Sequence, residues 1–440
     1  MKRSHPSIQR SLRLAVITAI ALTALVACGG GSKTGSQMQW IEGTAPASAQ
    51  LQAAAIPTVT ASMANTAAPA ADTALPAATG AAAQVTQALA VHPTATAPAS
   101  KSARLTKDQL AQYKPDELGL IPVLEYHLLT SDSTDNQQFV RPISKFRSDL
   151  QWLYDHNFYV ISLHDMINNH IAAPAGKHPF AITFDDSTTG QFRYLIAADG
   201  SVTIDPDSGV GVMEAFFAKH PDFGHTAFFA VIATDSMCFD WQSTQVDADQ
   251  EQYCGQKITW LLDHGYEVGN HTVHHVNLLN VSNDTFLAEI GGNFEWAKAK
   301  DPRAYPDILA MPFGTYPDLA SKKQQRTWLR DGFTYKGVDY KLIGVLNVGS
   351  NPSPPVDSTD WDAVFIPRIQ AFDEDAKVSG GGGFDVWFPN FESRPESLYT
   401  SDGNPDTISV PNTLPIDVDG SHLDTDKIAA EGKKLIRYDG

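Results

Sequence analysis

The sequence predicts an α/β fold, a barrel of parallel strands with an inserted hairpin and long loops. Short apolar runs alternate with segments whose apolar residues recur at helical spacing. Acidic and histidine side chains follow directly after several of these runs, where a parallel barrel builds its active site. The turn signal Ala198-Asp199-Gly200 marks the stretch 193–211 as the inserted hairpin.

The predicted elements begin near Lys107 and are short. The apolar run 121–127 is predicted to be a buried strand. The segment 146–158 carries Phe146, Leu150 and Leu153 at helical spacing and is predicted to be a helix. Strands are further predicted at 159–163, 180–184, 226–232 and 266–269, helices at 212–219 and up to about 264, and a last apolar run lies at 308–310.

Composition narrows the class of protein. The chain has 440 residues, 42% of them hydrophobic, which is enough apolar surface for a sizeable core and excludes disorder over most of the length. With 32 Lys and Arg against 50 Asp and Glu, the net charge is −18. Nucleic acid is therefore not expected as a partner, because a polyanion needs a basic surface.

The N-terminus has the pattern of an export signal over residues 1–27. Four basic residues, Lys2, Arg3, Arg10 and Arg13, precede an uncharged, mostly apolar stretch at 14–27. That stretch is too short to span a bilayer, which takes about 20 helical residues. The alternatives are a plain secretory signal or a lipoprotein signal, since Leu25-Val26-Ala27-Cys28 resembles the lipobox of bacterial lipoproteins.

By that resemblance Cys28 is lipidated and becomes the first residue of the mature chain. The residue after it is Gly29 rather than Asp, which in such signals favours the outer membrane. Residues 28–105 are rich in Ala, Pro and Thr and are expected to form a flexible tether. The catalytic or binding domain is then expected at 106–440, exported, lipid-anchored to the envelope and monomeric.

Asp185 and Asp186 follow directly after the predicted strand 180–184. Two adjacent carboxylates take separate roles if one binds a cation, because the other is then left as a base. A solvated pair of aspartates in a turn is the alternative, and the adjacent sequence alone does not exclude it.

His271 and His275 come directly after the predicted strand 266–269. Their i, i+4 spacing places both on one face of a helical turn, which is a metal-ligand spacing. With Asp186 they supply the three protein ligands and open position of a catalytic metal centre. His274, at i+3, is an alternative to His275.

Pro312-Phe313-Gly314 forms a third element after the apolar run 308–310. Pro and Gly favour a sharp turn that directs backbone N–H groups towards a pocket.

In this order, Thr183-Phe184-Asp185-Asp186, His271-Thr-x-x-His275 and Pro312-Phe313-Gly314 resemble the first three motifs of the NodB-type polysaccharide deacetylases, carbohydrate esterase family 4. The resemblance covers about residues 119–370. It implies a distorted (β/α) barrel of the NodB-homology type, a divalent metal (most often Zn²⁺) and hydrolysis of N-acetyl groups on amino-sugar polymers.

The resemblance also implies roles for individual residues. Asp185 is the general base, Asp186, His271 and His275 bind the metal, and the Phe313 N–H helps to hold the oxyanion. The sequence 123–127, Val-Leu-Glu-Tyr-His, resembles the N-terminal strand of the circularly permuted branch, which includes exported poly-N-acetylglucosamine deacetylases. In that branch the acid histidine comes from this strand, so His127 is the expected general acid; a structural histidine at a strand end is the alternative.

Two positions depart from the family pattern, and a third segment fits it only on paper. Ala310 stands where Arg often holds the base, and we expect Arg368 to orient Asp185 instead. Ser187 stands where Gly usually follows the Asp pair. The sequence Asp357-Ser-Thr-Asp360-Trp361 fits a fourth motif on paper, in a Pro- and Asp-rich loop where chance accounts for it nearly as well.

Further expectations concern the substrate and the cysteines. Phe313, Tyr316 and Trp361 are candidates for stacking on sugar faces, with core packing as the alternative for each. Cys238 and Cys254 are expected to form a disulfide in an exported protein, with free thiols as the alternative.

The predicted function is metal-dependent removal of N-acetyl groups from an N-acetylglucosamine-containing polysaccharide. Two other classes stay open, a catalytically inactive glycan-binding lipoprotein on the same scaffold and an O-acetyl esterase of carbohydrates. Ala310 and Ser187 are the positions that favour an inactive scaffold.

Overall fold

A computed structural model describes residues 104–131, 138–241, 250–349, 351–373, 382–413 and 423–440. The predicted signal segment, Cys28 and the predicted tether lie outside these residues, apart from the last two positions of the tether. In the part that is described, no helix combines the length and apolar character needed to cross a bilayer.

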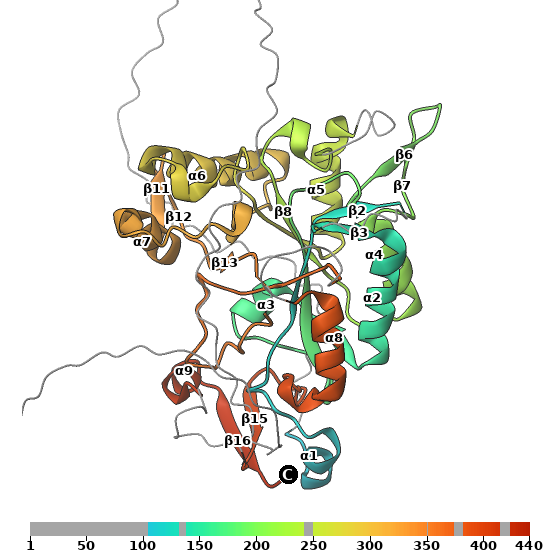
Figure 1. Ribbon diagram of the computed structural model, residues 1–440, viewed down its shortest axis with the longest axis vertical. Helices are drawn as coiled ribbons and strands as arrows, with labels where there is room; N and C mark the ends of the chain where they lie inside the picture. The colour runs from blue at the N-terminus through green and yellow to red at the C-terminus, as the bar shows by residue number, and fades with distance from the viewer. Residues whose placement is uncertain (1–103, 132–137, 242–249, 350, 374–381, 414–422) are drawn as a thin grey trace, which may run out of the picture. The chain divides into compact units, whose positions relative to one another are not determined.

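An eight-stranded sheet forms the centre of the fold, and all its pairs are parallel. The strand order is β13-β10-β9-β8-β5-β1-β14, with β4 also paired to β5. The sheet curls into a half-barrel with helices around it (Figure 1), so the predicted distorted (β/α) barrel is confirmed. Its strands are β1 Val123–Tyr126, β4 Phe158–Val160, β5 His178–Phe184, β8 Phe228–Val231, β9 Glu267–Asn270, β10 Ile308–Ala310, β13 Gly344–Leu346 and β14 Ile369–Gln370.

Helices surround this sheet, and four two-stranded pairs lie beside it. The helices are α1 Lys107–Tyr113, α2 Ile143–Asp155, α3 Leu163–Ile167, α4 Gly209–Lys219, α5 Cys254–Asp263, α6 Asn283–Lys300, α7 Lys323–Asp331, α8 Phe384–Ser393 and α9 Thr425–Ala430. The small pairs are β2 Leu128–Thr130 with β3 Val140–Pro142, β6 Tyr194–Ile196 with β7 Val202–Ile204, β11 Phe333–Tyr335 with β12 Val338–Tyr340, and β15 Thr407–Pro411 with β16 Lys434–Tyr438.

Alternation along the strands divides the core into two faces. In β5, Phe180, Ile182 and Phe184 pack with residues of α2, α4, α5 and α8, whereas Ala181 packs in a second cluster with residues of β10, β13 and α3. Because side chains alternate, Thr183 and Asp185 share the inner face with Ala181. The inner face of the half-barrel therefore leads from an apolar base to a polar end.

One predicted strand differs from the structure, and the predicted hairpin is confirmed. The predicted strand 159–163 ends at Val160, because Ser162 caps α3 by accepting a hydrogen bond from the Asp165 N–H, and Leu163 begins that helix. The predicted hairpin is present as the antiparallel pair β6–β7.

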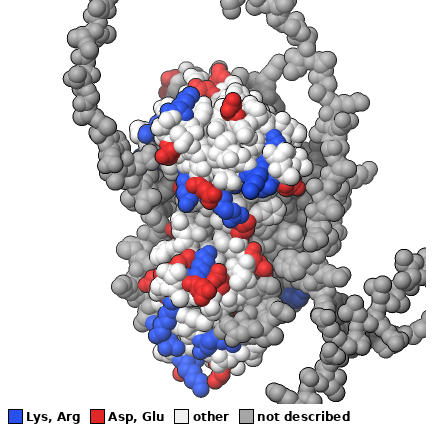
Figure 2. All heavy atoms as spheres, turned by 90° about the vertical axis from the view of Figure 1, so that its left-hand side faces the viewer, with Lys and Arg blue, Asp and Glu red and all other residues white. Residues whose placement is uncertain are grey.

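Over the described part of the face in Figure 2, Lys and Arg lie interspersed with Asp and Glu.

Candidate active site

The candidate acids and histidines lie at the carboxyl ends of neighbouring strands, whereas Arg368 comes directly before a strand. Asp185 and Asp186 follow β5, His271 follows β9 and His127 follows β1. Arg368 immediately precedes β14, the edge strand beside β1. Because the strands are parallel and adjacent, their carboxyl ends lie side by side at the same end of the sheet.

Asp186, His271 and His275 form a group with the composition of a metal site. The same oxygen of Asp186, Oδ1, lies 3.1 Å from His271 Nε2 and 3.3 Å from His275 Nε2. One ligand atom from each residue falls within 4.8 Å of the other two, a spacing that a single cation can bridge. Burial raises the pKa of Asp186, but hydrogen bonds with the two histidines outweigh it and hold the pKa far below its usual range.

The tautomer of His271 suits a metal ligand. Its Nδ1–H donates to the backbone carbonyl of Ala310 at 2.9 Å. In the neutral ring this leaves the lone pair on Nε2, the atom that faces Asp186. Residue 310 therefore serves the site through its backbone, which an alanine provides as well as an arginine.

The prediction of a helical turn at 271–275 is wrong. Thr272 and His275 have φ angles of 63° and 52°, and no helix is assigned at these residues. The Asn270 side chain accepts a hydrogen bond from the Thr272 N–H at 2.9 Å, which turns the chain immediately after β9. The two histidine rings come together, with centroids 4.9 Å apart, through this loop and not through helical periodicity.

Glu289 of α6 separates the roles of His274 and His275. It accepts the His274 N–H at 2.8 Å and pairs with the His274 ring at 2.9 Å. The side chain of His274 is 64% exposed and points to α6, whereas His275 faces Asp186. Of the two alternatives in the sequence, the structure brings His275 to the site.

Asp185 is held by Arg368 in a two-pronged ion pair. Both distances, Nη1 to Oδ1 and Nη2 to Oδ2, are 2.7 Å, and the Arg368 side chain is fully buried. Burial raises the pKa of Asp185, but the Arg368 guanidinium outweighs it and holds the pKa below its usual value. Arg368 thus contacts both carboxylate oxygens of Asp185.

Glu125 is a buried acid that sequence analysis did not single out. Its Oε1 accepts Arg368 Nη2 at 2.9 Å and lies 3.7 Å from His127 Nε2. Burial raises the pKa of Glu125 to about 8, although Arg368 acts against this. The available signal was a charged residue inside an apolar strand, two positions before His127 and so on the same face.

His127 lies beside both acids at the end of β1. Its Nε2 is 4.0 Å from Asp185 Oδ2 as well as 3.7 Å from Glu125. Burial lowers the pKa of His127, and the nearby aspartates oppose this only in part. The ring therefore releases a proton more readily than an exposed histidine.

Glu125, His127 and Asp185 also have the spacing of a metal site. However, Arg368 places its positive charge directly on two of them, which opposes the binding of a cation there. The Asp186 group has histidine rings as its neighbours and no guanidinium hydrogen-bonded to it among the described residues. The two adjacent aspartates are thus assigned to different partners.

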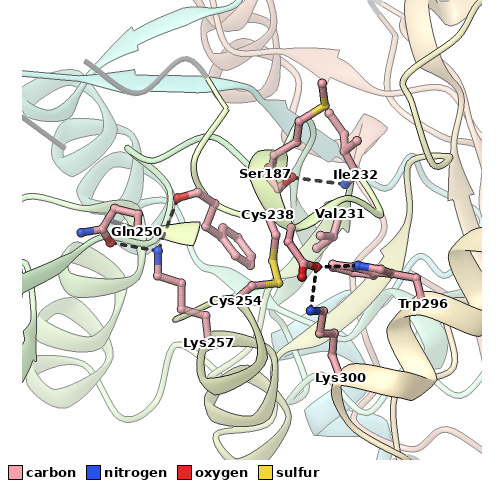
Figure 3. The surroundings of a disulfide bond; sticks show 12 residues. Ser187, Val231, Ile232, Cys238, Gln250, Cys254, Lys257, Trp296 and Lys300 are labelled. Carbon is pink, nitrogen blue, oxygen red and sulfur yellow. Dashed lines mark hydrogen bonds and ion pairs between the residues drawn. A yellow bond between two sulfur atoms is a disulfide. The ribbon is translucent and has the colours of Figure 1, made fainter. Parts of the chain in front are cut away.

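Ser187 adopts a conformation that usually requires glycine. Asp186 and Ser187 have φ angles of 75° and 46°, in the left-handed region. The Ser187 hydroxyl donates to the Met237 carbonyl at 2.9 Å and accepts the Ile232 N–H at 3.2 Å (Figure 3). These bonds compensate for backbone strain at the loop that carries both aspartates.

The predicted aromatic residues are only partly gathered at the site. Phe313, with φ 60° and a 60% exposed side chain, has its ring 4.6 Å from that of His275. Tyr316 packs edge-on against Phe365. Trp361 packs against the inner core cluster, in a loop that passes the opposite end of the sheet, where Ser353 pairs with Ile121. Trp361 therefore has the core-packing role that the sequence left open as the alternative.

One protein-family model matches part of the chain. Residues 225–330 match the family model described as Polysaccharide deacetylase, which is less than half of the chain. No curated protein shows a significant match. The matched segment includes His271, His275 and Phe313 and leaves out both aspartates, His127 and Arg368.

Several solved structures are similar at low identity. A Streptococcus pyogenes deacetylase, PplD, in complex with acetate is 17% identical, with 58% of this chain and 94% of that chain covered and a TM-score of 0.40. IcaB from Ammonifex degensii is 16% identical, with 58% and 94% covered and a TM-score of 0.38. A de-N-acetylase from Aggregatibacter actinomycetemcomitans is 14% identical, with 62% and 99% covered and a TM-score of 0.39. The family that the chain matches is thus the polysaccharide deacetylases, over the segment that carries the two histidines of the candidate metal group.

Proposed function

We propose that the chain is a metal-dependent hydrolase that removes N-acetyl groups from an N-acetylglucosamine-containing polysaccharide at the cell envelope. The observation that carries this is the division of the adjacent aspartates. Asp186 faces two histidines and Asp185 is held by a buried arginine. This is the arrangement of one metal ligand and one base within reach of the same substrate atom.

Asp186, His271 and His275 would hold the metal, most often zinc in such sites. When bound, a divalent cation polarises the acetamide carbonyl and lowers the pKa of a nearby water. Asp185, kept ionised by Arg368, accepts a proton from the attacking water. The backbone N–H of Phe313 donates to the developing oxyanion.

His127 completes the proton path. Breaking the amide C–N bond leaves acetate and an amine, and the amine nitrogen needs a proton. Asp185 Oδ2 lies 4.0 Å from His127 Nε2, so a proton taken from water can pass through His127 to the leaving nitrogen. The lowered pKa of His127 favours this release.

The two positions that favoured an inactive scaffold have physical explanations. Arg368 orients Asp185 in place of residue 310, and Ser187 uses its hydroxyl to hold the strained loop. Neither substitution removes a group that the proposed reaction needs. For this reason we favour an active enzyme over a glycan-binding protein.

The test is acetate release by the full chain from N-acetylglucosamine oligomers. We expect release with zinc, loss with a chelator, and loss in Asp185→Asn even when zinc is present. Asp207→Asn, at an exposed ion pair with Arg147, is the matched control and should retain release. Release from small acetyl esters but not from the oligomers would identify an O-acetyl esterase instead, and binding without any release would identify a glycan-binding protein.

We propose further that Cys28 carries the lipid anchor of an exported protein, most simply at the outer membrane. The support is the sequence of the signal segment alone. Labelling cells with a radioactive fatty acid should mark the wild-type chain and not Cys28→Ala. An equally labelled variant would contradict the anchor without affecting the proposed chemistry.

A further inference from the structure

Three aromatic rings flank the histidines of the candidate site. Trp241 and Phe313 have ring centroids 4.8 Å and 4.6 Å from that of His275, and Phe139 lies 4.6 Å from His127. They come from separate segments: the residues before β3, the loop after β8 and the turn after β10. Phe139 and Phe313 are 40% and 60% exposed, and Trp241 is half-buried.

Trp241 differs from the other described tryptophans. Each of these packs against one of the hydrophobic core clusters: Trp152, Trp260, Trp296, Trp328, Trp361 and Trp387. Trp241 belongs to none of these clusters, and its recorded ring contact is with His275. Among the residues that the structure describes, core packing therefore does not explain why a tryptophan lies here.

The backbone around Trp241 is fixed on two sides. On the side of the aspartates, its carbonyl accepts the Thr189 N–H at 3.4 Å, and Met237 accepts the Ser187 hydroxyl. On the other side the disulfide Cys238–Cys254 ties the segment to the start of α5 (Figure 3). Phe239, between these anchors, is fully buried, and its carbonyl accepts Lys257 Nζ at 3.3 Å.

This anchoring places a partly exposed aromatic side chain beside the candidate metal group before any ligand arrives. A preorganised ring loses little conformational entropy when a ligand packs on it. Pyranose rings have C–H faces that pack on aromatic side chains, and sites for small ligands combine such apolar walls with a few polar groups. A polymer substrate must extend beyond the acetylated sugar, so the neighbouring sugar needs a surface of this kind.

We infer that Trp241, held by the Cys238–Cys254 disulfide, is a substrate-binding residue that stacks on the sugar ring next to the one whose acetamide is hydrolysed. The inference rests on the proposed function and adds a residue that determines the length of substrate that is bound. A competing explanation is that Trp241 only supports the ring of His275. The two make different predictions, because support of His275 affects metal binding and stacking affects the affinity for oligomers.

The test compares Trp241→Ala and Trp241→Phe with the wild-type full chain. Calorimetry measures the affinity of zinc-loaded protein for N-acetylglucosamine monomer and for β-1,4- and β-1,6-linked pentamers, and zinc per chain is measured separately. For the better-bound pentamer we expect affinity about tenfold weaker in Trp241→Ala, which corresponds to about 1.4 kcal/mol, with a smaller loss for the monomer. Trp241→Phe should restore most of the affinity. Leu195→Ala, at an exposed residue of β6, is the control for loss of exposed apolar surface.

The disulfide supplies a second, independent variant. Cys238→Ser with Cys254→Ser leaves Trp241 in place but releases its anchor, and should weaken pentamer binding in the same direction. Equal affinities in the wild type and Trp241→Ala, or a loss that is explained by lower zinc content, would overturn the inference. Binding and acetate release are measured separately, so a wild type that binds pentamer through Trp241 and releases no acetate would contradict the proposed function alone.

Discussion

Two buried histidine clusters lie at opposite ends of the same strands. At the amino ends, His164 of α3 lies between Glu267, which begins β9, and Asp307, which precedes β10, at 2.6 Å and 2.7 Å. At the carboxyl ends, His271 follows β9 and donates to Ala310 of β10. Both clusters pair histidines with carboxylates, yet they differ in how completely their polar groups are satisfied.

The cluster at the amino ends is closed. Both ring nitrogens of His164 contact carboxylates, and Glu267 also accepts Ser162 and the backbone N–H of Leu163, which fixes the start of α3. Burial lowers the pKa of His164, but the two carboxylates outweigh it and raise the pKa to about 10. A fully paired histidine that is charged at neutral pH stabilises the fold and has no ring nitrogen left for a ligand.

The cluster at the carboxyl ends is open. Burial lowers the pKa of both His127 and His275, which favours the neutral ring that a metal ligand requires. Glu125 Oε2 has no hydrogen-bond partner among the described residues, and the loops contain the left-handed residues Asp186 and Thr272. Histidines and carboxylates thus stabilise the fold where all their polar atoms are paired. They are suited to chemistry where some of those atoms stay unpaired.

The largest effect should come from removing a ligand at the open end. His275→Ala should reduce acetate release on the order of 10³-fold, because a bound metal stabilises the transition state by several kcal/mol. His274→Ala is the matched control, since His274 bonds to Glu289 instead. Zinc content and rate are measured together. Loss of zinc in His274→Ala and not in His275→Ala would reverse our assignment.

Disrupting the His164 cluster should lower the stability of the fold and leave the chemistry of the candidate site unaffected. His164→Gln should lower the free energy of unfolding by about 3 to 5 kcal/mol, because it leaves buried carboxylates without their charge partner. The folded-state pKa is raised from 6.5 to about 10, so the stabilisation is complete below pH 6.5. It declines as the pH rises towards 10. Urea unfolding of both chains across this range should show their difference shrinking with pH, while a constant difference would contradict the linkage.

Glu125→Gln tests whether the acid beside His127 matters for turnover. Above pH 8, where Glu125 is ionised, the variant loses a hydrogen bond between charged groups. Such a bond is worth about 1.5 to 3 kcal/mol, so a loosened Arg368 should slow acetate release about tenfold to a hundredfold at that pH. Zinc content should not change. Glu117→Gln, at a fully buried glutamate that accepts the Asp402 and Ser409 N–H groups, is the control and should alter stability alone. Equal rates of acetate release in the two variants would show that Glu125 does not contribute to turnover.

The smallest effect is expected at Ser187. Ser187→Gly should relieve about 1 to 2 kcal/mol of left-handed backbone strain and lose two hydrogen bonds worth about 1 kcal/mol each. The two contributions nearly cancel, so the midpoint of thermal unfolding should change little. A large loss of stability would show that the hydroxyl contacts to Met237 and Ile232 hold the loop more strongly than we infer.

Sequence analysis located most of the candidate site because strand ends are visible in the sequence. Asp185, Asp186 and His271 each follow an apolar run, and parallel strands bring such positions together whatever the exact contacts. The fold class followed from the same alternation. The C-terminal elements, β15, β16 and α9, were not predicted, and short strands near Pro, Gly and Asp have no periodicity that would indicate them.

By itself, the sequence determined which residue types lie at the strand ends and the acidic net charge. It also indicated the pair of cysteines that the structure joins in a disulfide. Those properties are local, so periodicity and composition are sufficient to find them. Only the tertiary structure decided that His275 and not His274 faces Asp186, that Arg368 contacts both Glu125 and Asp185, and that Trp361 packs against the inner core cluster. Each of these depends on contacts between residues far apart in the chain, and the backbone path of the loops, set by left-handed turns and by side chains of α6, is what brings them together.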